Sequence, residues 1–419
     1  MTKWQEVKLG EICTIIDGDR GKNYPKSNEL QPQGYCLFLN TKNVPDNKFN
    51  FSECTFISKD KDELLGKGKL NYGDIVVTTR GTLANFAYYT KKCIYNKIRI
   101  NSGMVILRNE NKDLCTHYLY HFLISNNFKQ QVQSLATGSA QPQLPIKDMK
   151  NIIMNLPPID IQKKIAGVLG ALDDKIELNN RINNNLEQQA QVLFNNIYNT
   201  NNNGTLADIV DVVESGSRPK GGAINKGIPS IGAENIEKFG VYDYSKEKFI
   251  DEIFYEKMKH GKVAAGDVLL YKDGAYTGKV SLALDGYPHR ICAVNEHVFI
   301  IRGKSDVTSQ FFLYFCLSDE KNKNYLHTLA SSKAAQPGLN QSELLGLPIF
   351  IPASAVVKNF TLSVAPMMHK IASNAIENNK LSALRDTLLP KLMSGEVDVS
   401  KVDISALTST DKLSFNEGE

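Results

Sequence analysis

Residues 158–200 read PIDIQKKIAGVLGALDDKIELNNRINNNLEQQAQVLFNNIYNT, and this stretch decides the fold. Its apolar residues recur mostly every three or four positions, which is the spacing of one face of an α-helix. The stripe consists of Ile161, Ile165, Leu169, Leu172, Ile176, Ile182, Leu186, Leu193 and Ile197. No proline or glycine interrupts it after Gly170, and the run 199–203 followed by Gly204 ends it. We predict a helix about 40 residues long, roughly 55 to 60 Å at 1.5 Å per residue.

A second stripe of the same kind runs from about Ala355 to Met393. It contains Phe360, Val364, Met367, Ile371, Leu381, Leu384, Leu388 and Leu392. Because a narrow stripe cannot bury itself alone, we expect the two helices to pair with each other as an antiparallel coiled coil. Such pairing would relate the two halves by a pseudo-two-fold axis, with a module at each end of a stiff spacer. A helix of this kind is more often only an oligomerisation device, but the internal repeat weighs against that interpretation.

The sequence is a duplication, because four landmarks recur in the same order with nearly constant offsets. They are residues 9–12 and 206–209 (offset 197), 73–76 and 266–269 (193), 140–142 and 335–337 (195), and 156–157 and 351–352 (195). Each copy opens with short β-rich runs, at 74–79 and 103–107 and again at 267–271 and 297–301, and a short helical pattern follows. The fold class is therefore mixed α/β, with two tandem modules.

The predicted organisation has five parts. They are a first module at 1–157, a long helix at 158–200, a second module at 201–352, a second long helix at 353–396, and a polar, disordered tail at 397–419. A length of 419 residues and an apolar fraction of 42% fit a folded protein of two or three domains. No stretch approaches the roughly 18 to 20 apolar residues that span a bilayer, and the opening residues lack a signal-peptide core. We expect a cytoplasmic protein.

Seven cysteines are scattered along the chain without a CxxC pair or a Cys/His ligand spacing. Reduced thiols and no structural zinc fit this pattern best. Residues 1–155 hold 21 Lys and Arg against 14 Asp and Glu, whereas residues 201–350 hold 17 against 18. Only the first module has the basic excess expected of a phosphate-binding surface.

Motifs for chemistry are missing from the sequence. Residues 155–159 have no aromatic residue where an adenine methyltransferase would need one, and they are better interpreted as a helix start. Residues 274–280 are one residue short of a P-loop and indicate a turn. His117 and His121 have i, i+4 spacing without the acidic neighbour of a HExxH site, which favours an ordinary helix surface. We therefore predict no catalytic residue, no metal site and no cofactor in this chain.

The chain resembles the specificity subunits of type I restriction-modification enzymes over nearly its whole length. The resemblance lies in the module openings at 9–12 and 206–219, in the Gly-Asp strands at 73–81 and 266–269, and in 141–144 leading to 156–165. Residues 351–354 lack the second proline and the glutamine of this last motif, so the second helix start matches poorly. The order of the motifs still holds.

This resemblance implies that each module is a target-recognition domain for one half of a bipartite, asymmetric DNA sequence, and that the helices set the gap. It also implies that two modification subunits dock on the helices and methylate adenine with S-adenosylmethionine. Two restriction subunits would join and cut DNA with ATP and magnesium. A free-standing DNA enzyme and a coiled-coil scaffold without sequence-specific DNA binding are the alternatives.

The candidate DNA contacts are polar and basic residues in loops beside the β runs, because such side chains bind phosphates and base edges. In the first module they are Arg20, Lys22, Arg80, Thr82, Lys91, Lys92, Lys97 and Arg99. In the second they are Arg218, Lys220, Lys226, Lys272, Tyr276, Lys279, His289, Arg290 and Lys333. Gln141 and Gln336 are interpreted as parts of equivalent turns, and the asparagines at 179–180 and 183–185 as a wet face that sets helix register.

Overall fold

The computed structural model describes residues 4–138, 142–199, 201–332 and 338–403, and the chain divides into two compact units. Unit 1 contains residues 1–174 and 383–419, and unit 2 contains residues 175–382. Both long helices are shared between the units: α6 spans Ile159–Ile197 and α12 spans Ser354–Ser394. The domain boundaries predicted from the sequence lie at the ends of these helices instead, and they stay a prediction.

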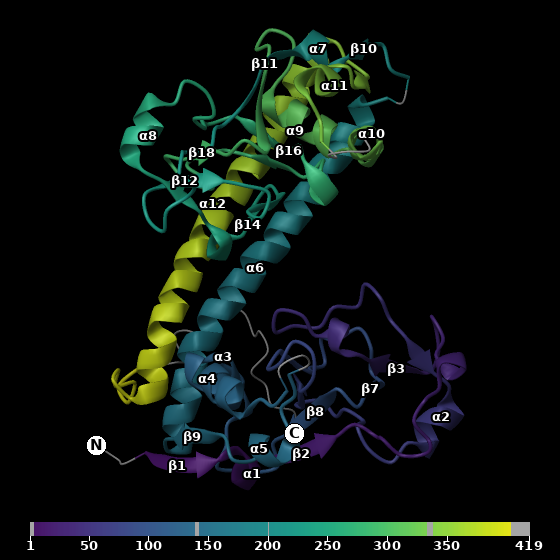
Figure 1. The fold of residues 1–419 in the computed structure, drawn as a ribbon, viewed down its shortest axis with the longest axis vertical. Helices are drawn as coiled ribbons and strands as arrows, with labels where there is room; N and C mark the ends of the chain where they lie inside the picture. The colour runs from purple at the N-terminus through teal and green to yellow at the C-terminus, as the bar shows by residue number, and fades with distance from the viewer. Residues whose placement is uncertain (1–3, 139–141, 200, 333–337, 404–419) are drawn as a thin grey trace. The chain divides into compact units, whose positions relative to one another are not determined.

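Unit 1 contains a four-stranded sheet in the order β2-β8-β5-β6, a three-stranded sheet in the order β4-β3-β7, and the pair β1-β9 (Figure 1). Its strands are β1 Gln5–Lys8, β2 Thr14–Asp17, β3 Cys36–Leu39, β4 Phe56–Ile57, β5 Ile75–Thr78, β6 Phe86–Tyr88, β7 Ile98–Ile100, β8 Met104–Arg108 and β9 Ile153–Leu156. Its helices, besides the α6 and α12 segments, are α1 Leu9–Ile12, α2 Lys59–Leu64, α3 Thr116–Ile124, α4 Asn126–Leu135 and α5 Ile146–Met149, with 3-10 turns η1 Ser27–Glu29 and η2 Thr41–Asn43.

Unit 2 repeats this plan, with sheets β11-β19-β16-β17 and β15-β12-β18 and the pair β10-β20; one further pair is β13-β14. Its strands are β10 Gly204–Thr205, β11 Val210–Ser215, β12 Ile228–Ile231, β13 Ile236–Lys238, β14 Val241–Tyr242, β15 Phe249–Ile250, β16 Val268–Tyr271, β17 Val280–Leu282, β18 Ala293–Val294, β19 Val298–Gly303 and β20 Pro348–Ile349. Its helices are α7 Leu206–Ile209, α8 Glu252–Lys257, α9 Gln310–Ser318, α10 Glu320–Ser331 and α11 Gln341–Leu345, with η3 Tyr244–Lys246 and η4 Gly274–Tyr276. The predicted duplication and the mixed α/β class are confirmed, and η4 confirms the turn expected at 274–280.

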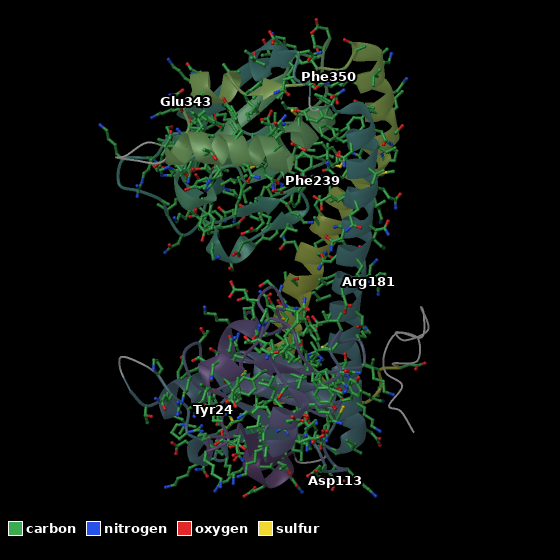
Figure 2. All side chains as sticks on the ribbon, turned by 90° about the vertical axis from the view of Figure 1, so that its right-hand side faces the viewer. Tyr24, Asp113, Arg181, Phe239, Glu343 and Phe350 are labelled. Carbon is green, nitrogen blue, oxygen red and sulfur yellow. The ribbon has the colours of Figure 1, made fainter. Side chains whose placement is uncertain are left out.

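The core of each unit is closed by both long helices. In unit 1, Ile165 and Leu169 of α6 and Leu392 of α12 are buried with the sheet residues. In unit 2, Phe194 of α6 and Val364 of α12 are buried in the core of that unit. Phe239, labelled in Figure 2, packs edge-on against rings of this second core, with centroids 5.5 Å from Tyr287 and 5.9 Å from Tyr314. The apolar stripes therefore complete the modules as well as packing helix on helix.

The helices run antiparallel, as predicted, and asparagines lie between them in unit 2. The Asn374 side-chain amide donates to Asn183 Oδ1 at 2.8 Å, and Asn179 donates to Glu377 Oε2 at 2.8 Å and to Asn378 Oδ1 at 2.9 Å. Asn179 is 1% exposed and Asn374 is fully buried. The predicted role in helix register is supported, but the prediction of a wet face is wrong for these buried residues.

The start of α6 is anchored by Gln162, which is fully buried. Its carbonyl accepts from the Cys115 backbone N–H at 2.9 Å, and its amide donates to the carbonyls of Asp113 and Pro157, each at 2.8 Å. The second copy has no glutamine at the matching place, so this particular anchor exists only in unit 1.

Two expectations about individual segments are wrong. His121 is not on a helix surface, because it is 2% exposed; burial, with the nearby charges of His117 and Arg385, lowers its pKa to about 3. The tail is also not loose throughout: Val399 is buried in the unit 1 core, and Val397 and Val402 pack against that core. Residues 404–419, like Gln141 and Gln336, lie outside the described residues.

Replacing Asn374 by alanine should destabilise the helix pair, because Asn183 would stay buried without its hydrogen-bond donor. The expected loss is about 1–3 kcal/mol, visible as a lower thermal midpoint by circular dichroism. The double variant Asn183→Leu, Asn374→Leu should recover most of this loss, since both polar partners are replaced by apolar groups. Asn196→Ala, at an exposed position of α6, is the control. Equal midpoints for Asn374→Ala and Asn196→Ala would contradict the assignment.

Candidate nucleic-acid interface

One turn is built twice from the Gly-Asp landmark of the sequence. Gly73 and Gly266 have φ of 95° and 94°, which favours glycine, and the following aspartate accepts a backbone N–H three residues earlier. Asp74 also forms a bidentate ion pair with Arg108, at 2.9 and 2.8 Å, and Asp267 forms one with Arg302, at 2.6 and 2.8 Å. The repeated sequence motif therefore marks a structural frame.

Two loops cross beside this frame in each unit. We define the crossed loops as residues 18–22 with 66–69 in unit 1, and residues 216–220 with 259–262 in unit 2. A Cβ added to Gly68 would lie 3.2 Å from the Gly18 Cα, and one added to Gly261 would lie 2.4 Å from the Gly216 Cα. The backbones approach this closely because glycine stands on both loops.

The Asp–Arg pairs hold the second loop of each crossing. Arg108 donates to the Lys69 carbonyl at 3.1 Å, and Arg302 donates to the Lys262 carbonyl at 3.3 Å. In unit 1, Asp19 ties the two loops together, since its carboxylate accepts from the N–H groups of Gly21 at 2.8 Å and Gly66 at 2.9 Å. These two hydrogen bonds lower the pKa of Asp19. The loops are therefore held before any ligand binds.

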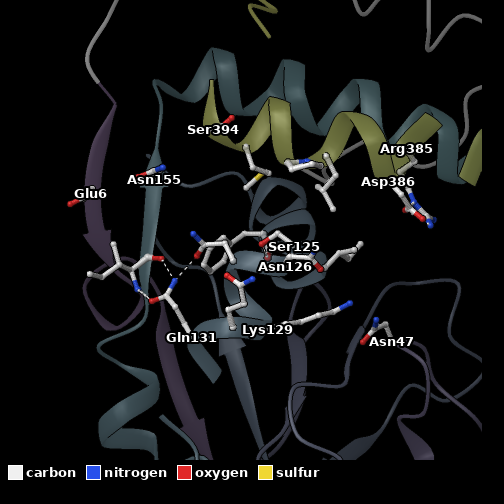
Figure 3. Close-up of a pocket in the computed structure, with 18 residues that line it drawn as sticks. Glu6, Asn47, Ser125, Asn126, Lys129, Gln131, Asn155, Arg385, Asp386 and Ser394 are labelled. Atoms are coloured by element: carbon white, nitrogen blue, oxygen red, sulfur yellow. Dashed lines mark hydrogen bonds and ion pairs between the residues drawn. The ribbon is translucent and has the colours of Figure 1, made fainter. Parts of the chain in front are cut away.

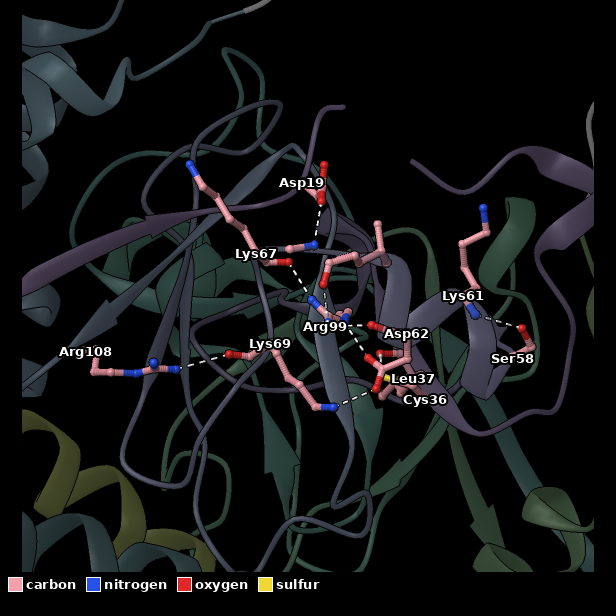
Figure 4. A network of polar contacts seen from close by, with 12 residues as sticks. Asp19, Cys36, Leu37, Ser58, Lys61, Asp62, Lys67, Lys69, Arg99 and Arg108 are labelled. Atoms are coloured by element: carbon pink, nitrogen blue, oxygen red, sulfur yellow. Dashed lines mark hydrogen bonds and ion pairs between the residues drawn. The ribbon is translucent and has the colours of Figure 1, made fainter. Parts of the chain in front are cut away.

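A buried ion pair supports the crossed loops of unit 1 from below (Figure 4). Arg99 and Asp62 are paired, with side chains 6% and 1% exposed. Arg99 also donates to the carbonyls of Lys67 at 2.7 Å and Leu65 at 2.9 Å. Burial alone would raise the pKa of Asp62, but hydrogen bonds from Lys69 and Arg99 outweigh it, so the pKa is lowered. Arg99, a predicted DNA contact, is therefore a structural residue, because its guanidinium is buried and bonded to Asp62 and to backbone carbonyls.

Unit 2 solves the same packing problem without that ion pair. Sheet register and helix bounds place Ala293 where unit 1 has Arg99, and Tyr255 where it has Asp62. Glu214 supports the loops instead: it binds Arg302 at 3.2 Å, His260 at 3.1 Å and the Gly261 N–H at 3.3 Å. The chain itself thus shows an uncharged pair of residues where the other copy has a buried ion pair, a change that is often tolerated when both partners are exchanged.

The structure places the other candidate residues in two groups. The exposed ones are Arg20, Lys22, Arg80, Thr82, Lys91, Lys92, Arg218, Lys220, Lys226, Tyr276 and Arg290. The half-buried ones are Lys97, Lys272, Lys279 and His289. The ammonium groups of three of these lysines form cation–π contacts: Lys97 lies over the Tyr35 ring, Lys272 over Phe299 and Lys279 over Tyr276. The imidazole of His289 is hydrogen-bonded to the Glu247 carboxylate. Lys333 lies outside the described residues.

The crossed loops bring together only part of this set. Arg20 and Lys22 lie on the crossed loops of unit 1, and Arg218 and Lys220 lie on those of unit 2. Sequence reasoning missed their neighbours Lys67 and Lys69 in unit 1 and Lys259, His260 and Lys262 in unit 2. The signal for them was present, because Gly68 and Gly261 are separated by the same 193 residues as the Gly-Asp landmarks.

Each unit also has a cleft between a short helix and a long one. The unit 1 cleft, about 750 Å³, lies between α4 and the last turns of α12 and is lined by Lys129, Gln130 and Arg385 (Figure 3). The unit 2 cleft, about 540 Å³, is lined by Lys323 and Asn324 of α10 and Gln191 of α6. These lining residues correspond at a constant offset of 194. The cleft is therefore part of the repeat.

The fold and this interface define a class of protein: two copies of one module, each presenting a basic crossing of loops. In the described ranges no group of three His, Cys, Asp or Glu side chains is arranged to hold a metal ion, and no helix is long and apolar enough to cross a membrane. None of the seven cysteines, all of which lie in the described ranges, forms a disulfide bond.

Comparison with known proteins gives the family. A model described as "Type I restriction modification DNA specificity domain" matches residues 1–188. The HindI specificity subunit of Haemophilus influenzae is 25% identical, over 95% of this chain and 100% of its own length. The MjaIX specificity subunit of Methanocaldococcus jannaschii is 26% identical, over 79% of each chain. A crystal structure of the S subunit of a type I restriction-modification system from M. genitalium has a TM-score of 0.59 at 15% identity, covering 93% of this chain and 96% of that one, and supports the fold.

The chain is similar to type I restriction-modification specificity subunits, through the family model over residues 1–188 and through relatives that match 79% or more of its length. The expectation drawn from its sequence motifs is thereby confirmed. The description of the matching model names a DNA specificity domain, which agrees with the DNA recognition that the sequence motifs imply.

Asp62→Asn should lower stability at neutral pH by about 3–5 kcal/mol, because it leaves Arg99 buried without its counter-charge. The pKa of Asp62 is lowered by folding, so its contribution is present above about pH 4 and is lost as the pH falls through the folded value. Thermal midpoints between pH 7 and pH 3 should therefore fall less steeply for Asp62→Asn than for the wild type. Asp60→Asn, at an exposed position of the same helix, should behave like the wild type. A parallel pH profile for Asp62→Asn would refute this role.

Proposed function

We propose that this chain is the DNA-reading subunit of a type I restriction-modification complex, and that each unit reads one half of a bipartite, asymmetric target. The observation that carries the proposal is the duplication of one framed, basic loop crossing in a chain of this family. One recognition surface would suit a continuous site. Two copies of it in one chain suit two half-sites of different sequence, because the frame is kept while the surrounding residues differ.

The proposal extends to the partners. Two modification subunits bind the chain, one at each of the two equivalent clefts, since a surface built twice accepts two copies of the same partner. Those subunits supply adenine methylation with S-adenosylmethionine, and two restriction subunits supply ATP- and magnesium-dependent cleavage. The complex acts in the cytoplasm. This chain contributes no cofactor of its own.

Deleting only this chain should abolish methylation of a two-part motif while leaving the modification subunit in place. The measurement is adenine methylation across genomic DNA, with and without this chain, in cells that carry the candidate modification subunit. Loss of a two-part motif with a fixed gap is the expected result. Unchanged methylation, or loss of a short continuous motif, would favour the scaffold alternative, to which the near-neutral charge of residues 201–350 points.

Charge reversal in one cleft should remove one modification subunit. Lys129→Glu and Lys323→Glu change matched residues of the two clefts, and native mass spectrometry of the purified complex counts the bound subunits. Each single variant should retain one copy and the double variant none. Lys112→Glu, exposed in unit 1 and outside the cleft, is the control. Full occupancy of the double variant would place the docking surface elsewhere.

A further inference from the structure

The crossed loops carry cations that no carboxylate of the described chain neutralises. Lys22, Lys67, Lys220 and Lys259 are exposed, and none of them has an ion-pair partner among the described residues. Figure 4 shows the Lys67 side chain leading away from the buried network, while its backbone carbonyl accepts from Arg99. The loops thus present unpaired ammonium groups, while the buried charges and backbone carbonyls beneath them already have hydrogen-bond partners.

The acidic groups nearest the loops are already occupied. Asp19 accepts two backbone N–H groups, and Asp62 is held by Arg99 and Lys69. Asp17 is paired with Arg20 at 3.2 Å. In unit 2, Glu214 is shared among Arg302, His260 and the Gly261 N–H. The charge left over on both loop crossings is positive, even though the net charge of the second module is close to zero.

Unit 2 adds hydroxyl groups to these cations. A hollow of about 350 Å³ is lined by Ser215, Gly216 and Ser217, by Lys257, Lys259 and His260, and by the apolar side chains of Phe254 and Met258. Hydroxyls, ammonium groups and a backbone without a side chain at Gly216 are the donors that suit a phosphate oxygen approaching closely.

We propose that the crossed loops of each unit bind the phosphate backbone of DNA and read no bases. This inference rests on the proposed function and deepens it: the loops supply affinity and position each module, while other exposed residues read the sequence. The glycine crossing and the Asp–Arg frame hold the backbone of the loops that carry these lysines, so less backbone conformational entropy is lost when a phosphate binds. Local cations rather than bulk charge then explain how a nearly neutral second module binds DNA.

Salt dependence of binding tests this assignment. The variants Lys22→Ala, Lys67→Ala in unit 1 and Lys220→Ala, Lys259→Ala in unit 2 are made in the full chain, in complex with the modification subunit. Fluorescence anisotropy gives Kd for DNA with the methylated motif and for scrambled DNA at several salt concentrations. Each double variant should reduce the slope of log K against log salt by about 2, since one phosphate contact contributes roughly 0.9. Both DNAs should weaken by a similar factor.

The control is Lys48→Ala, Lys112→Ala, which removes two exposed lysines of unit 1 that lie off the crossed loops. If this control lowers the salt slope as much as the loop variants do, the effect comes from total charge and not from the crossed loops, which would overturn the inference. A changed methylation motif in the loop variants would also overturn it, because the loops would then read bases. If the salt slopes of the loop variants are unchanged while the chain still prefers the methylated motif, only this inference is wrong. If the wild type does not distinguish the motif from scrambled DNA, the proposed function is wrong.

A second variant tests the crossing without changing charge. In Gly18→Ala the added Cβ would lie 2.2 Å from the Asn101 carbonyl oxygen, so the loop must move. Gly66→Ala is the matched control, since its nearest contact is 3.8 Å. Gly18→Ala should weaken binding to both DNAs at least tenfold and Gly66→Ala by less than twofold, with circular dichroism confirming that each is folded. Equal affinity of the two variants would contradict preorganised loops; if Gly18→Ala does not fold, the lysine variants decide.

Discussion

Burial of apolar residues from both long helices inside each unit is the interaction on which the rest of this protein depends. Neither module closes its core from its own strands and short helices alone: Leu169 and Leu392 complete one core, and Phe194 and Val364 complete the other. Because α6 and α12 each contribute to both cores, loss of their antiparallel register would open two hydrophobic cores at once. The buried asparagines fix that register, since an amide that loses its partner inside the helix pair is costly.

The duplication separates what the fold requires from what it permits. The Asp–Arg pairs, the positive-φ glycines before them and the glycine crossings are kept in both copies, because each solves a backbone problem that few residues can solve. The support beneath the loops is not kept: Arg99 and Asp62 in one unit correspond to Ala293 and Tyr255 in the other. A constant frame with variable surroundings is the arrangement expected of a module that presents different readers on one scaffold.

Sequence reasoning failed where burial could not be inferred from residue type. Arg99 and His121 are of residue types that usually lie on surfaces, and surface positions were expected for them, yet Arg99 completes a buried ion pair and His121 is a core histidine with a lowered pKa. Val399 follows a helix in a polar segment and was assigned to a loose tail, although it packs into the unit 1 core. In each case the decisive partner is distant in sequence, and no local pattern reports such a partner.

The sequence by itself determined the duplication, the mixed α/β class, the two long helices and the resemblance to type I specificity subunits, because periodicity and repeated motifs can be recognised along the chain itself. It also located four of the loop cations, Arg20, Lys22, Arg218 and Lys220. Only the tertiary structure decided that these lie beside Lys67 and Lys259, and that Arg99 faces inward. The physical reason is that a charge becomes a binding group or a structural one according to the carboxylates and carbonyls around it. Those neighbours are set by how strands and loops pack, which the order of residues along the chain does not display.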